Sequence, residues 1–287
     1  MDKFLIVTNQ DKDRDLRVTK EIKRYVESRD CMCHLAEPMV GTDLLQTGYT
    51  DMSKLQEDVD CVIVVGGDGT FIQTVRDFAG LDIPMVGVNM GTVGFLAAID
   101  VDGLHDGLDA LIYGKFTIQQ RIMLLGQVYR EGRRLHKSIA FNDVIVTRSG
   151  FSRLVELKIY VNDQLLDIYA ADGVIVSTPT GSTGYNLSAG GPVVFPETEM
   201  MIITPICPHS LSARSVVVSA QAKIKIEVGR RRKTQKEEAL VTYDGQTVWE
   251  LESSDVVEVV QASTKVPIVN IRQKSFCDIL RNKIKNV

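Results

Sequence analysis

Hydrophobic and polar positions follow two alternating patterns over the first hundred residues. Three short, continuous apolar runs are typical of strands covered on both faces: residues 3–8, 61–65 and 83–88. Between them, apolar side chains recur at helical spacing: Val18, Ile22, Tyr25 and Val26 in one segment, and Phe71, Ile72, Val75 and Phe78 in the next. Strands that alternate with helices predict a parallel sheet of the doubly wound type. We therefore expect an α/β domain over residues 1–98.

After about residue 100 the pattern changes to closely spaced runs rich in valine and isoleucine and bounded by turn residues. These runs are residues 124–131, 140–148, 154–162, 173–181, 215–220, 223–229, 238–245, 255–263 and 266–272. Such a pattern predicts a β-rich domain, over residues 99–270. The final segment, 271–287, has Phe276, Ile279, Leu280 and Ile284 at helical spacing. We expect it to form a helix that packs back on the first domain.

The composition is that of an ordinary globular protein, with 44% hydrophobic and 24% charged residues in 287. A net charge of −4 and a pI near 5.7 argue against a nucleic-acid-binding protein. The one strong basic run, residues 229–233, is followed by Glu237 and Glu238, and we interpret it as a solvated loop between strands.

The sequence also predicts a protein without a membrane anchor. No apolar stretch approaches the roughly 18 residues that cross a bilayer. The first residues lack the apolar core and cleavage site of a signal peptide, so we expect a cytoplasmic protein. Five cysteines at unrelated spacings predict reduced thiols rather than a disulfide framework, and four histidines show no metal-ligand spacing.

A glycine-rich turn follows the second predicted strand, in the order Gly66, Gly67, Asp68, Gly69 and Thr70. Glycines let a backbone approach phosphate closely, and the N-terminus of the next helix carries partial positive charge. Neither the P-loop nor the G-x-G-x-x-G motif is complete here. Asp68 therefore has two interpretations. It could cap the helix, or it could accept the proton of a hydroxyl that attacks phosphorus, as kinases use an aspartate.

A second glycine-bearing segment, residues 89–97, follows the third predicted strand. The carboxyl ends of parallel strands meet at one edge of the sheet, where open α/β folds bind ligands. Asp68 and Asn89 are therefore expected at the same edge, which favours a site over a cap.

Two further segments in the β-rich half carry candidate binding chemistry. Asn142 and Asp143 could form a simple turn before a strand, or an amide that reads an adenine edge and a carboxylate that accepts from ribose hydroxyls. The segment 177–191 could be an ordinary Ser/Thr-rich loop. It could also bind a ligand, because it gathers hydroxyl side chains around Gly181: Ser177, Thr178, Thr180, Ser182 and Thr183. Tyr185 adds a stacking face, and the small residues after it resemble a helix start that receives an anion.

Together these motifs resemble those of the NAD kinase family. The GGDGT motif is shared with diacylglycerol kinases and phosphofructokinases, so other motifs are more specific. These are FNDVIVTR, the long segment DGVIVSTPTGSTGYNLSAGGPVV, TPICPHSLSARSVVV and YDGQ, which occur in the family's order. The resemblance implies an α/β domain, a β-rich domain and an active site in the cleft between them. It also implies transfer of a phosphoryl group from ATP, with Mg²⁺ or another divalent metal, to the 2′-hydroxyl of the adenosine ribose of NAD. A homodimer or homotetramer is implied as well.

The resemblance assigns roles to individual residues. Asp68 corresponds to the proton acceptor. The NAD contacts implied are Asp68, Gly69, Phe95, Asn142, Asp143, Arg153, Asp172, Thr180, Thr183, Gly184, Tyr185, Asn186, Leu187, Ser188 and Gln246. The residues expected at the phosphate donor are Gly66, Gly67, Gly69, Thr70 and Asn89. No metal ligands are assigned. Two positions depart from the family pattern, because Asp143 stands where many members have Glu and Gly184 where Ala is usual.

Two alternatives remain at this stage. A lipid kinase of the diacylglycerol or sphingosine type shares GGDGT, but would require an acyl-chain pocket and a membrane-facing surface, and no basic amphipathic segment is evident. A non-catalytic NAD-binding sensor would be expected to lack Asp68, which is present.

Overall fold

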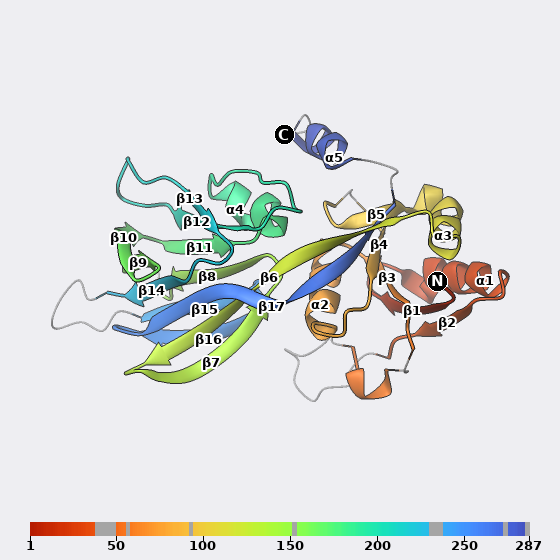
Figure 1. Cartoon of the computed structure of the whole chain (residues 1–287), viewed down its shortest axis with the longest axis horizontal. Helices are drawn as coiled ribbons and strands as arrows, with labels where there is room; N and C mark the ends of the chain where they lie inside the picture. The colour runs from red at the N-terminus through yellow and green to blue at the C-terminus, as the bar shows by residue number, and fades with distance from the viewer. Residues whose placement is uncertain are drawn as a thin grey trace. The chain divides into compact units, whose positions relative to one another are not determined.

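The computed structural model describes residues 1–37, 50–55, 58–91, 94–150, 154–229, 238–271 and 275–284. Its contacts divide the chain into two compact units (Figure 1). Unit 1 comprises Met1–Arg121 and Lys265–Val287, and unit 2 comprises Ile122–Thr264.

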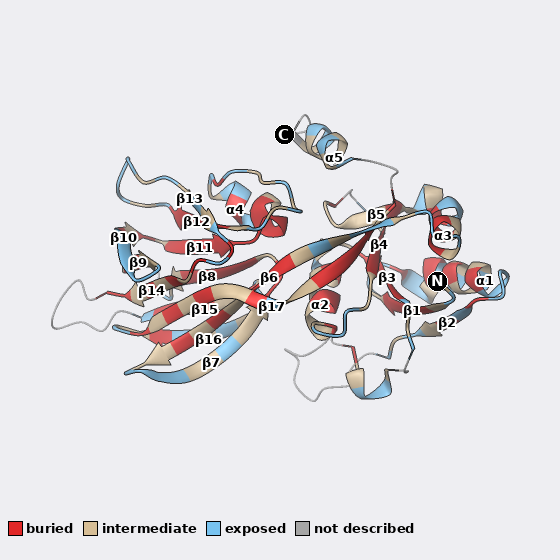
Figure 2. Cartoon of the chain, viewed as in Figure 1, coloured by how far each residue is buried: buried red, intermediate tan, exposed pale blue. Residues whose placement is uncertain are grey.

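Unit 1 is built on a parallel sheet. Its strands are β1 (Lys3–Thr8), β2 (Met32–Leu35), β3 (Cys61–Gly66), β4 (Met85–Asn89) and β5 (Ala97–Asp100). The order is β4-β3-β1-β2, and β5 pairs in parallel with β4. Every residue of β3 and β4 is buried, as continuous apolar runs require (Figure 2). The predicted α/β class with a parallel sheet is confirmed.

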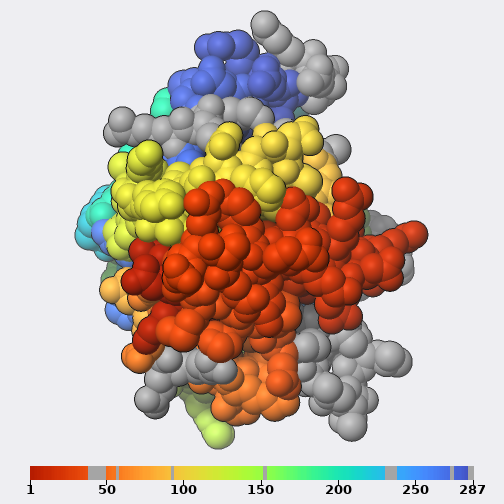
Figure 3. Space-filling view, turned by 90° about the vertical axis from the view of Figure 1, so that its right-hand side faces the viewer, coloured from red at the N-terminus to blue at the C-terminus, as the bar shows by residue number. Residues whose placement is uncertain are grey.

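The helices of unit 1 carry the expected apolar faces. They are α1 (Arg17–Glu27), α2 (Asp68–Asp77), α3 (Leu104–Ile112) and α5 (Phe276–Ile284), with 3₁₀ turns at Arg14–Leu16, Met52–Lys54 and Val101–Gly103. The buried carboxylate of Asp13 accepts the N–H groups of Val18 and Thr19 at 3.0 and 2.9 Å, so it caps α1. α1 and α3 lie side by side at the surface (Figure 3), where the rings of Tyr25 and His105 stack 4.3 Å apart.

Unit 2 is β-rich, as predicted. Its strands are β6 (Thr117–Arg130), which begins in unit 1, β7 (Arg133–Ala140), β8 (Asp143–Arg148), β9 (Val155–Val161), β10 (Gln164–Ala171), β11 (Gly173–Ser177), β12 (Met200–Ile206), β13 (Val216–Ser219), β14 (Ile224–Val228), β15 (Glu238–Tyr243), β16 (Thr247–Glu252) and β17 (Val256–Asn270), which ends in unit 1. One run of paired strands is β10-β9-β14-β17, and a separate antiparallel sheet has the order β13-β12-β11-β8-β15-β16. Side chains from both, such as Val174 and Ile226, share one hydrophobic core.

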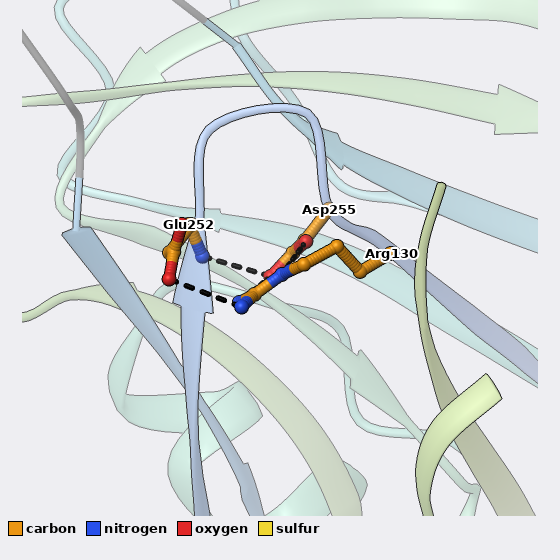
Figure 4. Close-up of polar contacts among 3 residues, drawn as sticks. All are labelled: Arg130, Glu252 and Asp255. Carbon is orange, nitrogen blue, oxygen red and sulfur yellow. Dashed lines mark hydrogen bonds and ion pairs between the residues drawn. The ribbon is translucent and has the colours of Figure 1, made fainter. Parts of the chain in front are cut away.

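An ion pair with a buried carboxylate ties β6 to the turn between β16 and β17 (Figure 4). The Arg130 guanidinium donates two hydrogen bonds to Asp255, both at 2.8 Å, and a third to Glu252 at 3.0 Å. Asp255 is only 1% exposed, and it also accepts the N–H of Glu252. Hydrogen bonding to Asp255 raises the pKa of Arg130, so the guanidinium stays protonated.

The boundaries of the two units differ from the domain boundaries that we expected from the sequence pattern. Residues 99–121 belong to unit 1 rather than to a domain that begins at 99. The reason is packing, because Ile99, Leu104 and Leu108 lie in the same core as the strands of the parallel sheet. The last segment of unit 1 begins at Lys265, within β17, instead of at residue 271, because Ile268 of this strand pairs in parallel with Met85 of β4.

Among the described residues, the longest apolar helices are too short to cross a membrane.

Candidate functional site

The glycine-rich turn connects β3 directly to α2. β3 ends at Gly66, and α2 begins at Asp68 after Gly67 in extended conformation. A Cβ at Gly66 would lie 2.7 Å from Oγ1 of Thr70, so the close packing of that side chain requires glycine. The expectation that two loops meet at one edge is confirmed, because Gly66 pairs with Asn89 and its carbonyl accepts the N–H of Met90 at 3.1 Å.

The Asp68 carboxylate points away from its own helix. Its Oδ2 accepts the N–H of Phe95 at 3.2 Å, and no side-chain capping bond is made at the start of α2. Its Oδ1 is buried and has no hydrogen-bond partner among the described residues. A Cβ at Gly94 would lie 2.7 Å from the carboxyl carbon of Asp68, so only glycine leaves room there. This geometry disfavours the interpretation of Asp68 as a helix cap, and leaves one carboxylate oxygen without a hydrogen-bond partner among the described residues.

The Phe95 side chain is held by the C-terminal helix. Its ring centroid lies 6.0 Å from that of Phe276, and Lys283 Nζ lies 4.7 Å from the Phe95 centroid. Both partners are on α5. The helix therefore supports the loop whose N–H orients Asp68.

Two residues that sequence reasoning missed lie beside the turn, in the segment after β1. The side-chain amide of Asn9 donates to Thr70 Oγ1 at 3.0 Å, and its backbone N–H donates to Val65 at 2.9 Å. Lys12 is exposed, and its Nζ would lie 2.5 Å from a Cβ at Gly67. The sheet-edge argument applied to the end of β1 would have found both, but this segment lacks the glycines that marked the other loops.

A second group of candidate residues lies in unit 2, where Asn142 directly precedes β8 and Asp143 begins it. Asp244, in the turn after β15, accepts the N–H groups of both, at 2.7 and 3.1 Å. Oδ1 of Asn142 is buried without a hydrogen-bond partner among the described residues. Asp143 is 5% exposed. Burial, and secondly the charge of Asp244, raise the pKa of Asp143 to about 7.

The segment 177–191, which is rich in hydroxyl side chains, packs against Asn142 and Asp143. The N–H of Thr178 donates to the Asn142 carbonyl at 2.8 Å, and its hydroxyl donates to the Phe141 carbonyl at 2.7 Å. The same hydroxyl accepts the N–H of Gly181 at 3.0 Å. A Cβ at Gly184 would lie 3.6 Å from Nδ2 of Asn142, so the usual alanine would be in ordinary contact with it. Residues 141–143 and 178–184 thus form one cluster, called the unit 2 cluster below.

Comparison with known proteins decides the family. A family profile described as ATP-NAD kinase N-terminal domain matches residues 4–116, and one described as ATP-NAD kinase C-terminal domain matches residues 141–271. An NAD kinase of Lachnoclostridium phytofermentans is 44% identical over 285 residues, covering 99% of each chain. The chain belongs to the NAD kinase family. An NAD kinase of Lachnospira eligens is 38% identical and covers 98% of this chain and 99% of its own.

Solved NAD kinase structures share the fold. A yeast NADH kinase complexed with NADH has a TM-score of 0.78 at 22% identity, covering 100% of this chain and 88% of its own. An NAD kinase from Archaeoglobus fulgidus in complex with ATP has a TM-score of 0.74 at 22% identity, covering 99% of each chain. Neither the lipid kinase nor the sensor alternative is favoured by these matches.

Several residues that the NAD kinase resemblance assigned to NAD lie at the surface of the unit 2 cluster. The side chains of Tyr185, Leu187 and Ser188 are exposed, whereas Thr180 is 7% exposed. Thr183 donates to the Thr180 carbonyl at 3.4 Å. Gln246 belongs to the same turn as Asp244, and its N–H donates to the Tyr243 carbonyl at 3.0 Å.

Asn186 differs from these residues because its amide is fully buried. Its Nδ2 donates to the carbonyls of Ser182 and Pro192 at 3.1 and 3.0 Å, and its Oδ1 accepts from Thr204 at 2.7 Å. The amide therefore holds the loop in this conformation. The helix that follows Gly184, α4 (Tyr185–Ser188), has only four residues, too short to provide the anion-receiving N-terminus that the sequence suggested.

The remaining assigned residues lie elsewhere. Asp172 pairs with Arg148 at 2.6 Å, at the end of β11 opposite to Ser177, which pairs with Asp143. The amide of Asn89 bonds to the backbone of Gly91 at 3.0 and 3.2 Å, so it stabilises its own turn. Arg153 lies outside the described residues, as does most of the basic run 229–233.

Proposed function

We propose that this member of the NAD kinase family transfers the terminal phosphoryl group of ATP to the 2′-hydroxyl of the adenosine ribose of NAD, with Asp68 as the general base. The observation that carries the proposal is the unpartnered, buried Oδ1 of Asp68, in a carboxylate whose other oxygen is fixed by Phe95. A second oxygen that is already oriented and free of partners among the described residues can accept a hydrogen bond from a substrate hydroxyl.

In this mechanism, the hydroxyl proton passes to Oδ1 of Asp68 as the ribose oxygen bonds to phosphorus. The bond between that phosphorus and the bridging oxygen breaks, which gives NADP and ADP, and Asp68 later releases the proton to solvent. General-base assistance of this kind contributes roughly a hundred- to ten-thousand-fold in rate. Positioning and stabilisation of charge supply the remainder.

The donor phosphates are proposed to bind at the glycine-rich turn. The backbone N–H groups of Gly67, Gly69 and Thr70 begin α2, where the helix dipole favours negative charge. Lys12 adds an ammonium group against Gly67. Gly66 and Asn89 shape the turn rather than supply charge.

A divalent cation, which the family implies, fits this site only as a companion of the phosphates. Among the described residues no group of three His, Cys, Asp or Glu side chains could hold a metal ion. Mg²⁺ commonly keeps several waters and binds through substrate phosphates with few protein ligands. Bound to the phosphates, it would neutralise part of their charge next to Asp68.

NAD is proposed to be recognised by the unit 2 cluster. The amide of Asn142 can accept from an adenine amino group through its unpartnered Oδ1. Asp143, with a pKa near 7, can accept from ribose hydroxyls when ionised and donate when protonated. Thr180, Thr183, Gly184, Tyr185, Leu187, Ser188, Gln246, Gly69 and Phe95 remain proposed contacts, and so do Asn186, through its backbone, and Arg153.

We further propose a homo-oligomer. Asp172 lies at the opposite end of β11 from the Asn142–Asp143 pair, so its assigned NAD contact is best explained by a second copy of the chain. Edge strand β10 also exposes Leu165 and Ile168, by 53% and 48%. Sedimentation equilibrium that reports only monomer at micromolar concentration would exclude this assembly.

The activity is tested by incubating the protein with NAD, ATP and Mg²⁺ and identifying the product. NADP with phosphate on the 2′-oxygen is the expected result. Phosphorylation of a lipid alcohol, or binding of NAD without turnover, would overturn the proposal.

A further inference from the structure

Asp244 adopts a left-handed backbone conformation, and its carboxylate meets residues 141–143 of the proposed NAD-binding cluster. Its φ is 53°, in the left-handed region that few residues adopt, and Gly245 follows at φ 66°. Asp and Gly in this order are typical of a tight turn between antiparallel strands, here β15 and β16. The turn projects the side chain of Asp244 toward residues about a hundred positions earlier in the chain.

Three consecutive backbone N–H groups converge on this one carboxylate. Oδ2 accepts from Phe141 at 2.8 Å, and Oδ1 accepts from Asn142 at 2.7 Å and from Asp143 at 3.1 Å. In return, the N–H of Asp244 donates to the Asp143 carbonyl at 3.0 Å. Hydrogen bonds to an ionised acceptor are about twice as strong as neutral ones, so the backbone of this loop is firmly held.

The same contacts use the backbone of residues 141–143 and not the side chains that are proposed to bind NAD. The Asn142 carbonyl is used by Thr178, and its N–H by Asp244, while its side-chain Oδ1 keeps no partner among the described residues. The backbone is therefore fixed from two sides, and the amide remains available to a ligand. Leaving a buried acceptor unpaired is unfavourable, and a bound hydrogen-bond donor would remove that cost.

We propose that Asp244 is a positioning residue for NAD recognition, because its carboxylate holds the backbone from Phe141 to Asp143 so that the Asn142 amide and the Asp143 carboxyl meet the dinucleotide. The inference rests on the proposed function of this loop as an NAD-binding element. It assigns Asp244 no contact with the reacting atoms, so its effect falls on NAD binding and not on phosphoryl transfer.

The test uses Asp244→Asn in the full-length protein. Asparagine tolerates the left-handed conformation as aspartate does, so the turn keeps its backbone preference. The substitution removes the charge and replaces one acceptor oxygen with an N–H₂ donor that faces a backbone N–H. The matched control is Asp163→Asn, which changes an aspartate at φ 65° in the turn between β9 and β10. Asp163 pairs with Lys223 and Lys225 and makes no contact with the loop.

For Asp244→Asn we expect the KM for NAD to rise at least tenfold. The KM for ATP should stay within twofold, and kcat at saturating NAD within threefold, because the residue acts on one substrate only. Asp163→Asn should leave all three parameters within twofold of the wild type. A merely structural role would instead lower the active fraction, which reduces kcat and leaves both KM values unchanged.

Several outcomes would overturn the inference. One is an unchanged KM for NAD in folded Asp244→Asn. Another is failure of that variant to fold, which would show that the carboxylate holds the whole unit. In the wild type, the backbone amides of Phe141, Asn142 and Asp143 should exchange hydrogen at least a hundredfold more slowly than those of an unstructured peptide. Exchange at the rate of an unstructured peptide would also contradict the inference. Calorimetry with wild-type protein and NAD distinguishes failure of this inference from failure of the proposed function. If the wild type does not bind NAD, the proposed function itself is contradicted.

Discussion

Phe95 donates its backbone N–H to Oδ2 of Asp68 at 3.2 Å, which fixes one oxygen of the carboxylate and leaves the other without a partner among the described residues. The two residues are 27 positions apart: Asp68 begins the helix after β3, and Phe95 lies in the loop after β4. A carboxylate held in this way is oriented before any substrate binds. Little reorganisation is then needed when a proton is transferred.

The first prediction concerns Asp68 itself. Asp68→Asn keeps the size of the side chain but removes the basic oxygen, so kcat should fall at least a hundredfold, within the range for a general base. Affinity for NAD, measured by calorimetry, should change less than threefold, because most of the proposed recognition residues lie in unit 2. Turnover near the wild-type value would show that another group accepts the proton.

The second prediction concerns the space next to this carboxylate. Gly94→Ala places a Cβ 2.7 Å from the Asp68 carboxyl carbon, so the carboxylate must move. We expect kcat to fall at least tenfold while the thermal unfolding midpoint changes by only a few degrees. Gly91→Ala is the matched control, because no atom lies within 4 Å of a Cβ at that position. Equal activity of the two variants would contradict a requirement for an exactly placed Asp68.

The sequence predicted the buried parallel strands β1, β3 and β4, and the sheet edge at which Asp68 lies, because both depend on local pattern. Buried parallel strands are continuous apolar runs, and the ends of neighbouring strands must meet at one edge of the sheet. From these two rules, Asp68 and Asn89 could be brought together without any coordinates. The structure agrees with this expectation, because Gly66 pairs with Asn89 at that edge.

The arrangement of the candidate residues in unit 2 depends on contacts between positions that are far apart in the sequence. Asp244 reaches Asn142 across 102 positions, and nothing in the local pattern of either segment indicates this. Asn186 lies within a segment that resembles a binding loop, yet its amide is used by Ser182, Pro192 and Thr204. Which polar side chains serve the fold and which remain free for ligand is decided by packing, which pattern alone does not show.

The third prediction concerns Lys12, which sequence reasoning missed. Its ammonium group lies against Gly67 at the start of α2, where the donor phosphates are proposed to bind. Lys12→Met should raise the KM for ATP at least fivefold and leave the KM for NAD within twofold. Because Lys12 is exposed, the difference from wild type should shrink as ionic strength rises. Lys23→Met, which removes a lysine that pairs with Glu27 in an exposed (i, i+4) pair on α1, should leave both constants unchanged. A similar effect of both variants would indicate a loss of general positive charge rather than a specific contact.

The fourth prediction concerns the pH dependence of stability. The pKa of Asp143 is raised to about 7 by burial and by Asp244, whereas an aspartate in the unfolded chain has a pKa near 3.9. Below pH 4 the group is protonated in both states, so it imposes no penalty on folding. Between about pH 4 and 7 the unfolded chain ionises while the folded protein keeps the proton, so the free energy of unfolding decreases as pH rises. Above pH 7 both states are ionised and the penalty is constant.

Asp143→Asn removes this titration without changing the size of the side chain. The variant should therefore lose less stability than the wild type between pH 4.5 and 7, with the difference reaching roughly 2–4 kcal/mol and staying constant above pH 7. Urea unfolding at pH 4.5, 6, 7 and 8 measures this difference directly. Parallel stability curves for the two proteins across the range would mean that Asp143 ionises in the folded state at its ordinary pKa. In that case the carboxyl group would be charged at neutral pH, and it could only accept hydrogen bonds from the dinucleotide.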